Sequence, residues 1–325
     1  VDIAVESQVR FHINNYNRNR MKIFLGILLG GIVIFGGPWN ARNEWPKEES
    51  APVVTEEETA MTIVTVGDVM LGRDENVRSI KAGDWNYPFL KSNKLFEGAD
   101  IALANLENPF VTGCKPTSVG MTFCAPDEAI SGLVWSGINV VNLANNHTRN
   151  YGATGYENTI NVLEKAGLDY CDESHMAIKE IRGKKIGILG FNLIEGRADR
   201  KNLKENLEKS KVLVDLLVVS VHWGSEYSVK SNVFQQEMAK LFIDSGAGLV
   251  VGHHPHVIQE IEEYKEKTIV YSLGNFVFDQ MWSEQTRMGL AGRFTYKDGE
   301  LRGPEIISVR IEKPGQPVAD GEWGL

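Results

Sequence analysis

Residues 61–68 read MTIVTVGD, a short apolar and β-branched run that ends in an acidic side chain. Runs of this kind predict buried β-strands. Four further apolar runs also end in polar residues. They are 101–106 (IALANL) before Glu107, 138–143 (INVVNL) before Asn146 and His147, 213–221 (LVDLLVVSV) before His222, and 249–251 (LVV) before Gly252-His253-His254-Pro255-His256. We therefore expect strands that each carry reactive side chains at the C-terminal end.

The segments between these strands have helical spacing of apolar residues. Helices are expected at 88–96, 128–135, 155–166 and 233–245, further strands at 184–191 and 268–272, and a closing hairpin at 290–296 and 304–312 around Lys297-Asp298-Gly299. Alternation of strands and helices predicts an α/β fold with largely buried strands.

The polar strand ends predict a metal site, because the carboxyl ends of strands converge in open α/β sheets. The expected ligands are Asp68, Glu107, Asn146, His222, His254 and His256. Carboxylates, an amide oxygen and imidazoles suit one or two divalent ions such as Mn, Fe or Zn, whereas calcium takes oxygen ligands only. His253 is the least certain of the neighbouring histidines, because strand alternation places it opposite His254 and His256.

Each of these residues also has a purely structural explanation. Asp68 is a plausible helix N-cap, Glu107 and Asn146 are plausible turn residues, and His222 is a plausible core histidine. Their joint appearance at successive strand ends favours the metal site.

Composition excludes several classes of protein. The 325 residues include 34 Lys and Arg against 43 Asp and Glu, and the net charge of −9 argues against nucleic-acid binding. A hydrophobic fraction of 42% with 24% charged residues excludes a disordered chain. Only 3 Cys are present, which excludes a disulfide-dense scaffold.

The N-terminal region predicts a membrane anchor. Residues 23–39 read IFLGILLGGIVIFGGPW, and no charge occurs between Lys22 and Arg42. As a helix this uncharged run spans about 28 Å, close to the thickness of a bilayer core. We expect an uncleaved transmembrane signal anchor at 21–41; a cleaved signal peptide and a buried core helix are the alternatives. Basic residues precede the run and acidic residues follow it, which predicts a single-pass protein with a cytoplasmic N-terminus and an extracellular domain.

The remaining boundaries follow from this topology. Residues 1–20 are expected to be a non-native or cytoplasmic extension before Met21, 42–60 an acidic linker, 61–312 the folded domain, and 313–325 a loose tail. An oxidising exterior favours a disulfide between Cys114 and Cys124, with two unpaired thiols as the alternative.

Six motifs in order resemble one known family. They are GDVMLGR (67–73), NLENP (105–109), NLANNH (142–147), VSVHWG (219–224), VVGHHPHVIQ (250–259) and YSLGNFVFD (271–279). Residues 61–312 resemble the bacterial capsule-synthesis CapA/PgsA family, which is associated with poly-γ-glutamate and belongs to the calcineurin-like metallophosphoesterase superfamily. The resemblance implies a four-layer αββα sandwich.

The resemblance also implies roles for residues. Asp68 and His256 resemble ligands of a first metal, Asn146, His222 and His254 resemble ligands of a second, Glu107 occupies the bridging position, and His147 resembles a general acid. Two positions depart from the superfamily pattern. Met70 replaces the histidine of the usual Asp-x-His, and Glu107 replaces an aspartate. We therefore expect one well-held ion and one weak or absent ion.

These features suggest three functions. The leading hypothesis is a membrane-anchored protein of capsule or poly-γ-glutamate biosynthesis or export, with a metal site that hydrolyses or transfers polymer. The alternatives are a general metal-dependent phosphoesterase and a non-enzymatic polymer-binding subunit of a membrane synthase complex. Expected partners are an anionic extracellular polymer and other membrane subunits. Arg73 and Asn275 are expected to clamp an anionic substrate, Arg73 also as a catalytic residue, although a surface cation and a turn amide are equal alternatives. Trp223 is expected in the cleft wall or in the core.

Overall fold

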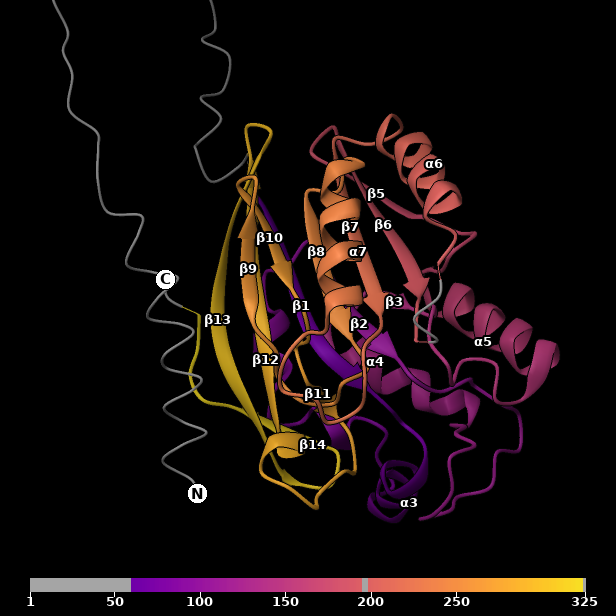
Figure 1. Ribbon diagram of the computed structural model, residues 1–325. Helices are drawn as coiled ribbons and strands as arrows, with labels where there is room; N and C mark the ends of the chain where they lie inside the picture. Colours follow the sequence, from indigo (N-terminus) through magenta and orange to yellow (C-terminus); the bar gives the residue numbers. More distant parts are fainter. Residues whose placement is uncertain (1–59, 195–197, 324–325) are drawn as a thin grey trace, which may run out of the picture.

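Two β-sheets pack face to face in the computed structural model, which describes residues 60–194 and 198–323 (Figure 1). The first sheet has 8 strands, seven of them in the order β14-β13-β12-β1-β2-β3-β4, and β11 also pairs with β1. Its strands are β1 (Met61–Val69), β2 (Ile101–Leu106), β3 (Val140–Asn142), β4 (Asp169–Cys171), β11 (Asn275–Val277), β12 (Met288–Lys297), β13 (Glu300–Lys313) and β14 (Gln316–Ala319). The strands from β1 to β4 run parallel.

The second sheet has 6 strands in the order β5-β6-β7-β8-β10-β9, with β6, β7, β8 and β10 parallel. Its strands are β5 (Ala177–Ile181), β6 (Lys184–Asn192), β7 (Leu216–His222), β8 (Leu249–His253), β9 (Ile261–Tyr264) and β10 (Lys267–Val270). Because the central strands are buried on both faces, they read as continuous apolar runs rather than alternating ones.

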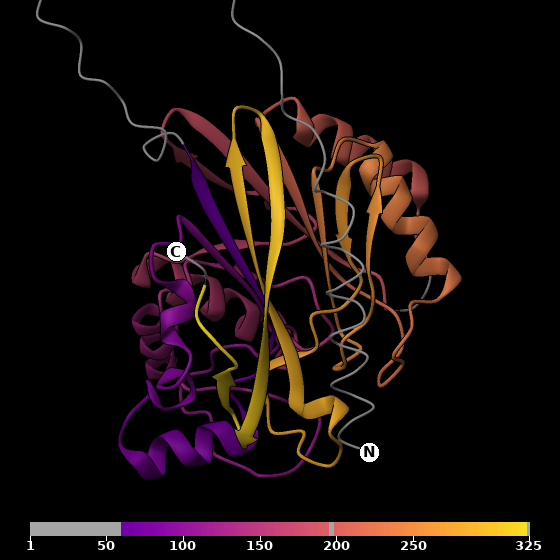
Figure 2. The same cartoon turned by 90° about the vertical axis from the view of Figure 1, so that its left-hand side faces the viewer.

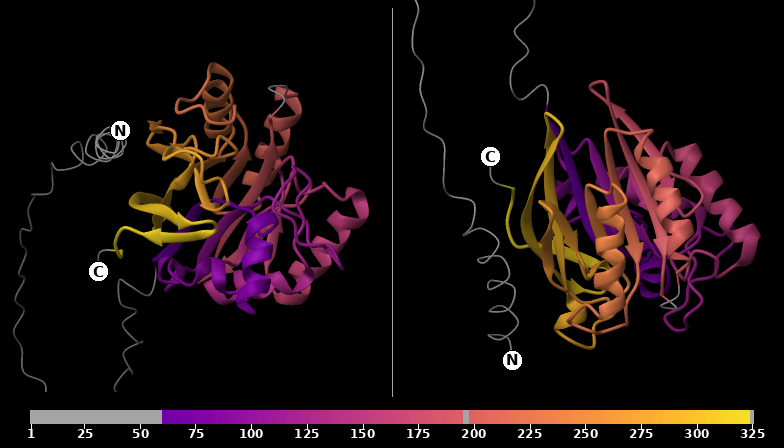
Figure 3. Two further views of the ribbon diagram at one scale, coloured as in Figure 1. Left: turned by 90° about the horizontal axis from the view of Figure 1, so that it is seen from below. Right: turned by 45° about the horizontal axis from the view of Figure 1, so that its top comes forward.

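Helices and 3₁₀ turns connect the strands. They are α3 (Arg73–Ala82), η1 (Tyr87–Phe89), η2 (Asn93–Phe96), η3 (Asp127–Ala129), α4 (Ile130–Ser136), α5 (Gly152–Ala166), α6 (Arg200–Lys211), α7 (Val233–Asp244) and η4 (Gln285–Arg287). Figure 3, seen from below, shows α3–α5 and α7 on opposite sides of the strands.

Three apolar clusters hold these layers together. Side chains such as Ile63, Leu103, Ile188 and Val218 fill the space between the two sheets. A second cluster joins the first sheet to α4, α5 and the 3₁₀ turns, and a third joins the second sheet to α6 and α7. The predicted α/β sandwich of two sheets with helices is therefore confirmed, since each sheet buries apolar side chains on both faces.

The predicted closing hairpin forms with longer arms than expected. Strands β12 and β13 are the long pair seen in Figure 2. Asp298 and Gly299 both have positive φ, 54° and 84°, as a tight hairpin turn with right-handed strand twist requires. The Asp-Gly pair is therefore the local reason for the turn.

Several elements differ from the sequence-based expectation. The helix expected at 88–96 is divided between η1 and η2, with Pro88 inside the first. Helices α3 and α6 were not expected, because their charged sequences bury little apolar surface; Leu207 and Ser210 are the buried residues of α6.

The tail expected to be loose is ordered through Trp323. Residues Gln316–Ala319 pair with β13 as strand β14, and the Trp323 indole N–H donates to the Leu95 carbonyl at 2.8 Å. The sheet edge left by β13 provides unpaired backbone groups that this short polar segment satisfies. A brief strand with few apolar residues gives too weak a pattern to predict.

Among residues 60–194 and 198–323, no helix combines the length and apolar composition needed to span a bilayer. The predicted extension at 1–20, the predicted anchor at 21–41 and all but the last residue of the predicted linker at 42–60 lie outside the described residues.

Cys114 and Cys124 form a disulfide in the loop between β2 and α4, and Cys171 is a free, buried thiol. The loop returns beside the polar strand ends, where the Phe123 ring stacks on the His147 ring with centroids 4.0 Å apart. The disulfide therefore restrains a segment that touches the predicted site.

We predict that the denatured, unreduced protein exposes one reactive thiol per chain and that reduction exposes three, the full cysteine content. Thiol titration under denaturing conditions measures both values, and Cys171→Ala is the control, with none before reduction. The double variant Cys114→Ser/Cys124→Ser should lose about 2–3 kcal/mol of stability, because a short closed loop is released in the unfolded chain. Three thiols before reduction would contradict the pairing.

Candidate metal centre

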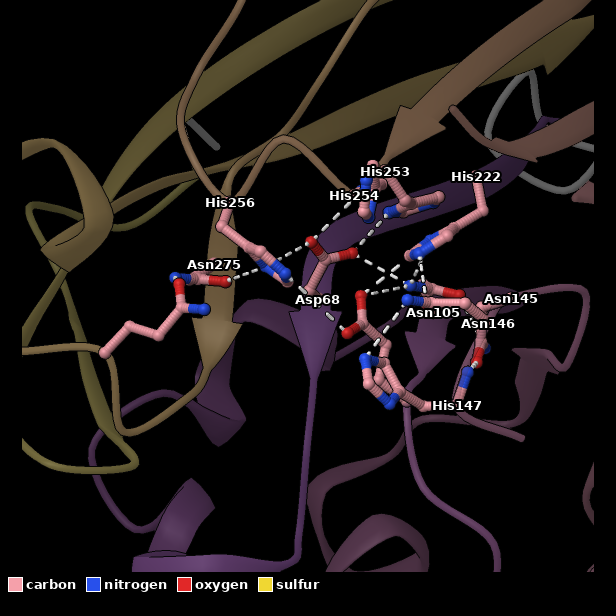
Figure 4. A network of polar contacts seen from close by, with 12 residues as sticks. Asp68, Asn105, Asn145, Asn146, His147, His222, His253, His254, His256 and Asn275 are labelled. Atoms are coloured by element: carbon pink, nitrogen blue, oxygen red, sulfur yellow. Dashed lines mark hydrogen bonds and ion pairs between the residues drawn. The ribbon is translucent and has the colours of Figure 1, made fainter. Parts of the chain in front are cut away.

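The carboxyl ends of strands from both sheets meet in one buried pocket (Figure 4). The first sheet provides Asp68 at the end of β1, Glu107 after β2, and the turn after β3. The second sheet provides His222 at the end of β7 and the histidine loop after β8. Parallel pairing places these ends at the same edge, because β1, β2 and β3 are in register through Asn105 and Asn142.

Asp68 lies at the centre of the pocket and is fully buried. Its Oδ1 lies 3.3 Å from His253 Nδ1, and its Oδ2 lies 3.1 Å from His256 Nδ1. Burial alone would raise the pKa of Asp68, but hydrogen bonds from these two histidines outweigh it and hold the pKa well below its usual range. Asp68 is therefore a carboxylate at neutral pH.

Glu107 is also fully buried, and its two oxygens face different histidines. Oε1 lies 3.8 Å from His222 Nδ1, and Oε2 lies 3.9 Å from His256 Nε2. Burial raises the pKa of Glu107 well above its usual range, and the negative charge of Asp68 raises it further. Among the described residues, Glu107 Oε2 has no hydrogen-bond partner.

Asn105 was not among the predicted site residues, yet it connects them. Its Nδ2 donates to Asp68 Oδ1 at 2.9 Å and to Glu107 Oε1 at 3.0 Å, and it lies 3.1 Å from His222 Nδ1. The Nδ2 atoms of Asn142 and Asn145 donate to its Oδ1 at 3.3 and 3.2 Å, which fixes the amide orientation. Its place at the start of the NLENP motif could have identified it from the sequence.

His222 is fully buried beside Asn146, whose side chain reaches the solvent. His222 Nε2 is 3.1 Å from Asn146 Oδ1, and Asn146 is exposed. Burial, followed by the nearby His254, lowers the pKa of His222 well below its usual range. The His222 ring is therefore neutral at pH 7, as a metal ligand must be.

The loop after β8 bends so that His254 and His256 both face the pocket. Their φ angles are 95° and 56°, which L-residues rarely adopt. Burial and His256 lower the pKa of His254 to about 4, and His254 Nδ1 has no hydrogen-bond partner in the described part of the chain. Backbone conformation, rather than strand alternation, therefore sets the direction of these rings.

The same bend explains His253, which strand alternation places on the opposite face. Its Nδ1 reaches Asp68 Oδ1, so the ring lines the pocket beside the two predicted ligands. The alternation argument fails here because the strand ends at His253 and the next residue has positive φ.

His256 is oriented by Asn275, which the sequence suggested as a substrate contact. Asn275 is fully buried, and its Oδ1 lies 2.9 Å from His256 Nδ1. Its Nδ2 donates to Gln280 Oε1 and to the Thr286 carbonyl. Its polar atoms are therefore occupied inside the protein, and it holds His256 with Nε2 turned toward Glu107.

His147 lies at the rim of the pocket, beside Asn146. Its Nδ1 is 3.1 Å from Asn150 Oδ1, and its ring is stacked on Phe123. Burial lowers the pKa of His147, against the opposing effect of the Asn150 contact. A neutral ring with Nδ1–H donated to Asn150 has an accepting Nε2, and Asn146 Nδ2 donates to this atom at 3.2 Å.

Two sets of three residues have the spacing to hold a cation. Asp68, Glu107 and His222 form a buried set that we call the inner triad, and Glu226, His254 and His256 form a set that we call the outer triad. Within each set, one ligand atom per residue lies within 4.8 Å of the others. The chemistry fits a divalent ion, because Glu107 Oε2 and His254 Nδ1 are buried without hydrogen-bond partners in the described chain.

Arg73 does not face this pocket as a free cation. It pairs with Asp279, and its guanidinium lies over the Phe123 ring, 4.6 Å from the centroid. The same Asp279 acts on Glu75, a buried residue of α3. Burial raises the pKa of Glu75 well above its ordinary value, and the negative charge of Asp279 raises it further. The predicted substrate clamp is thus neutralised by a partner from the YSLGNFVFD motif.

Two other side chains belong to the core. Met70 is fully buried with Phe123 and Phe278, and its sulfur accepts from the Gly72 N–H at 3.0 Å, so it does not reach the ligands. Trp223 is fully buried, stacks on Phe242 and Tyr271, and donates to the Tyr271 carbonyl. Core packing was one of its two expected roles.

Comparisons with known proteins find the same family. The family model described as "Bacterial capsule synthesis protein PGA_cap", which is metallophosphoesterase-like, matches residues 62–280. The chain is 29% identical to the "Capsule biosynthesis protein CapA" of Bacillus anthracis, over 92% of this chain and 78% of that protein. It is 30% identical to the "PGA biosynthesis protein CapA" of Bacillus subtilis (strain 168), over 90% and 81%.

A crystal structure of a hypothetical protein from Thermus thermophilus shares the fold. The TM-score is 0.53 with 14% sequence identity, and the match covers 76% of this chain and 98% of that one. At this identity the likeness concerns the fold alone.

We predict that Asn275→Ala weakens binding of Mn²⁺ by about 10–100-fold, because His256 loses the acceptor that fixes its ring. Calorimetric titration of the full chain measures the affinity. Asn202→Ala, an exposed asparagine on α6, is the matched control and should leave it unchanged. Unaltered Mn²⁺ affinity in a folded Asn275→Ala variant would refute the positioning role.

We predict that Glu75→Gln stabilises the protein increasingly as pH rises from 5 to 8. The raised pKa means that the folded chain keeps a proton which the unfolded chain releases above the ordinary value of 4.5, so wild-type stability falls with rising pH. Glutamine removes this loss. Thermal melts across the pH range compare the two proteins, and a difference in melting temperature that is constant or shrinks with pH would contradict the buried, protonated acid.

Proposed function

The chain belongs to the bacterial capsule synthesis protein family, and from this premise we propose that it is a membrane-anchored, extracytoplasmic protein of capsule or poly-γ-glutamate biosynthesis or export. We further propose that its metal site hydrolyses or transfers the anionic polymer, alongside other membrane subunits.

One observation carries the proposal of chemistry. Two buried carboxylates, four imidazoles and a surface amide converge from both sheets, and several of their buried atoms, among them Glu107 Oε2 and His254 Nδ1, have no hydrogen-bond partner within the described residues. Purely structural polar groups would be paired. This set would hold a divalent transition ion, through Asp68, Glu107 and His222 at least.

The extracytoplasmic location rests on two features. The disulfide between Cys114 and Cys124 suits an oxidising compartment. The uncharged run at 23–39, with basic residues before it and acidic residues after it, suits an anchor with the domain outside.

A bound divalent ion supplies a lowered water pKa and polarises the bond to be cleaved. The protein contributes the proton transfer. His147 Nε2 accepts a proton from the attacking nucleophile and returns it to the leaving nitrogen or oxygen as the polymer bond breaks. If the nucleophile is water the polymer is hydrolysed, and if it is the amine of another chain the acyl group is transferred.

Asn150 keeps His147 in the required tautomer through Nδ1, and the stacked Phe123 ring fixes its plane. The neutral state favoured by burial leaves Nε2 an acceptor, and the Asn146 Nδ2 amide donates to it at 3.2 Å in this structure, so the first proton reaches Nε2 only when that amide turns away.

We predict that the full chain binds a stoichiometric divalent metal and cleaves γ-glutamyl oligomers. His254→Ala and Glu107→Ala should lose metal and activity together. His147→Gln should keep the metal but lower kcat by about 10²–10⁴-fold, because only proton transfer is removed. Elemental analysis and a hydrolysis panel that includes phosphodiesters measure both properties.

His175→Gln is the matched control, since this exposed histidine stacks on Tyr170 outside the pocket. Absence of metal from the wild-type chain would end the enzymatic proposal. Metal without turnover of any substrate would favour a polymer-binding subunit, and cleavage of phosphodiesters alone would favour a general phosphoesterase.

A further inference from the structure

Glu226 is an exposed acidic residue in the loop between β7 and α7, and neither the motif resemblance nor the strand-end pattern included it. In space it belongs with His254 and His256, since one carboxylate oxygen and one nitrogen from each ring lie within 4.8 Å of one another. Ligands at about 2.0–2.2 Å from one ion lie at most roughly 4.4 Å apart. A small contraction would therefore bring all three onto a common ion.

The loop that carries Glu226 is fastened to the histidine loop on both sides. The Trp223 N–H donates to the His253 carbonyl at 3.1 Å, and the Tyr227 N–H donates to the Pro255 carbonyl at 2.8 Å. Gly224 and Tyr227 have φ of 84° and 63°, which turns the chain sharply at each side of Glu226. The backbone position of Glu226 beside the histidine loop is thus fixed.

The two histidines present suitable nitrogens toward Glu226. His254 is 5% exposed, and its Nδ1 has no hydrogen-bond partner within the described chain. His256 has Nδ1 engaged by Asn275 and Asp68, which leaves Nε2 as the ligand atom. A ring nitrogen held by an amide or carboxylate while the other binds a metal is a common arrangement around bound ions.

Glu107 connects the outer triad to the inner triad. Its Oε1 faces His222 of the inner set, and its unpartnered Oε2 faces His256 of the outer set. One carboxylate can therefore serve two neighbouring ions, one through each oxygen. The longer side chain of glutamate reaches both sets from the end of β2.

We propose that Glu226, a residue outside the family motifs, is a metal ligand and holds a second divalent ion together with His254 and His256, beside the ion held by Asp68, Glu107 and His222. This assignment moves His256 from the first-ion role that the resemblance implies for it. Glu226 adds a third ligand to the two histidines, whereas the Met70 sulfur is buried against Phe123 and Phe278 and accepts from the Gly72 N–H. The second ion would therefore take ligands from two loops, Glu226 from the loop after β7 and the two histidines from the loop after β8. The proposal therefore differs from the expectation of one well-held ion and one weak or absent ion, which followed from Met70 and Glu107.

The charge of the pocket favours two ions if the substrate is a polyanion. This part of the inference rests on the proposed function. The two triads contain three carboxylates, and Arg73 is already neutralised by Asp279. One divalent ion leaves the pocket with a formal charge of −1, which repels an anionic chain. Two ions give +1, at the solvent side where Glu226 and Asn146 are exposed.

The test counts ions without measuring activity. The purified full chain is stripped with chelator and titrated with Mn²⁺, while elemental analysis gives stoichiometry and electron paramagnetic resonance detects coupling between neighbouring ions. We expect two Mn²⁺ per wild-type chain with a coupled signal. Glu226→Gln should bind the second ion at least about tenfold more weakly and lose the coupled signal where the wild type is saturated.

Glu263→Gln is the matched control, because it removes the same charge from an exposed position on β9 and should behave as wild type. Circular dichroism checks that each variant is folded. A wild-type chain with a single Mn²⁺, or a Glu226→Gln variant with two coupled ions at wild-type affinity, would overturn this inference and leave the proposed function standing. A wild-type chain that binds no Mn²⁺ or other divalent metal would overturn both.

Discussion

Two carboxylates, Asp68 and Glu107, share one fully buried pocket, and their mutual repulsion is the constraint that the surrounding residues must satisfy. At the spacing of the inner triad, two such charges repel by about 3–4 kcal/mol at an effective dielectric constant of ~20. Asn105 Nδ2 donates to both carboxylates, and ring nitrogens of His253 and His256 lie within 3.3 Å of Asp68. The opposite pKa directions of Asp68 and Glu107 show that these donors do not fully compensate both charges. A divalent cation between them would.

The two-sheet architecture is what makes such a pocket possible. Each carboxylate comes from the first sheet, and the imidazoles come from β7 and the loop after β8 in the second. The apolar layer between the sheets fixes their relative position, so the pocket opens only where both sets of strands end. Local structure then aims the side chains, through positive φ at His254 and His256 and through the Asn275 contact.

Site residues that directly follow an apolar run could be predicted from the sequence. Asp68, Glu107 and His222 each follow an apolar run, and the run pattern is sufficient to find them. Apolar runs do not identify Glu226 as a site residue, and they do not show that Asn275 orients a histidine. Glu226 depends on backbone bonds between two loops, and Asn275 depends on parallel pairing of β11 with β1 across some two hundred residues. Weakly apolar elements such as α6 and β14 were missed for the same reason, since tertiary contacts decide them.

We propose that the buried acidic pocket is a metal centre. X-ray diffraction from crystals of the manganese-loaded chain, collected on both sides of the manganese absorption edge, locates bound ions without reference to activity. We expect anomalous peaks at bonding distance from Asp68, Glu107 and His222 and beside Glu226, His254 and His256. Anomalous density elsewhere on the protein, with none among these side chains, would contradict it.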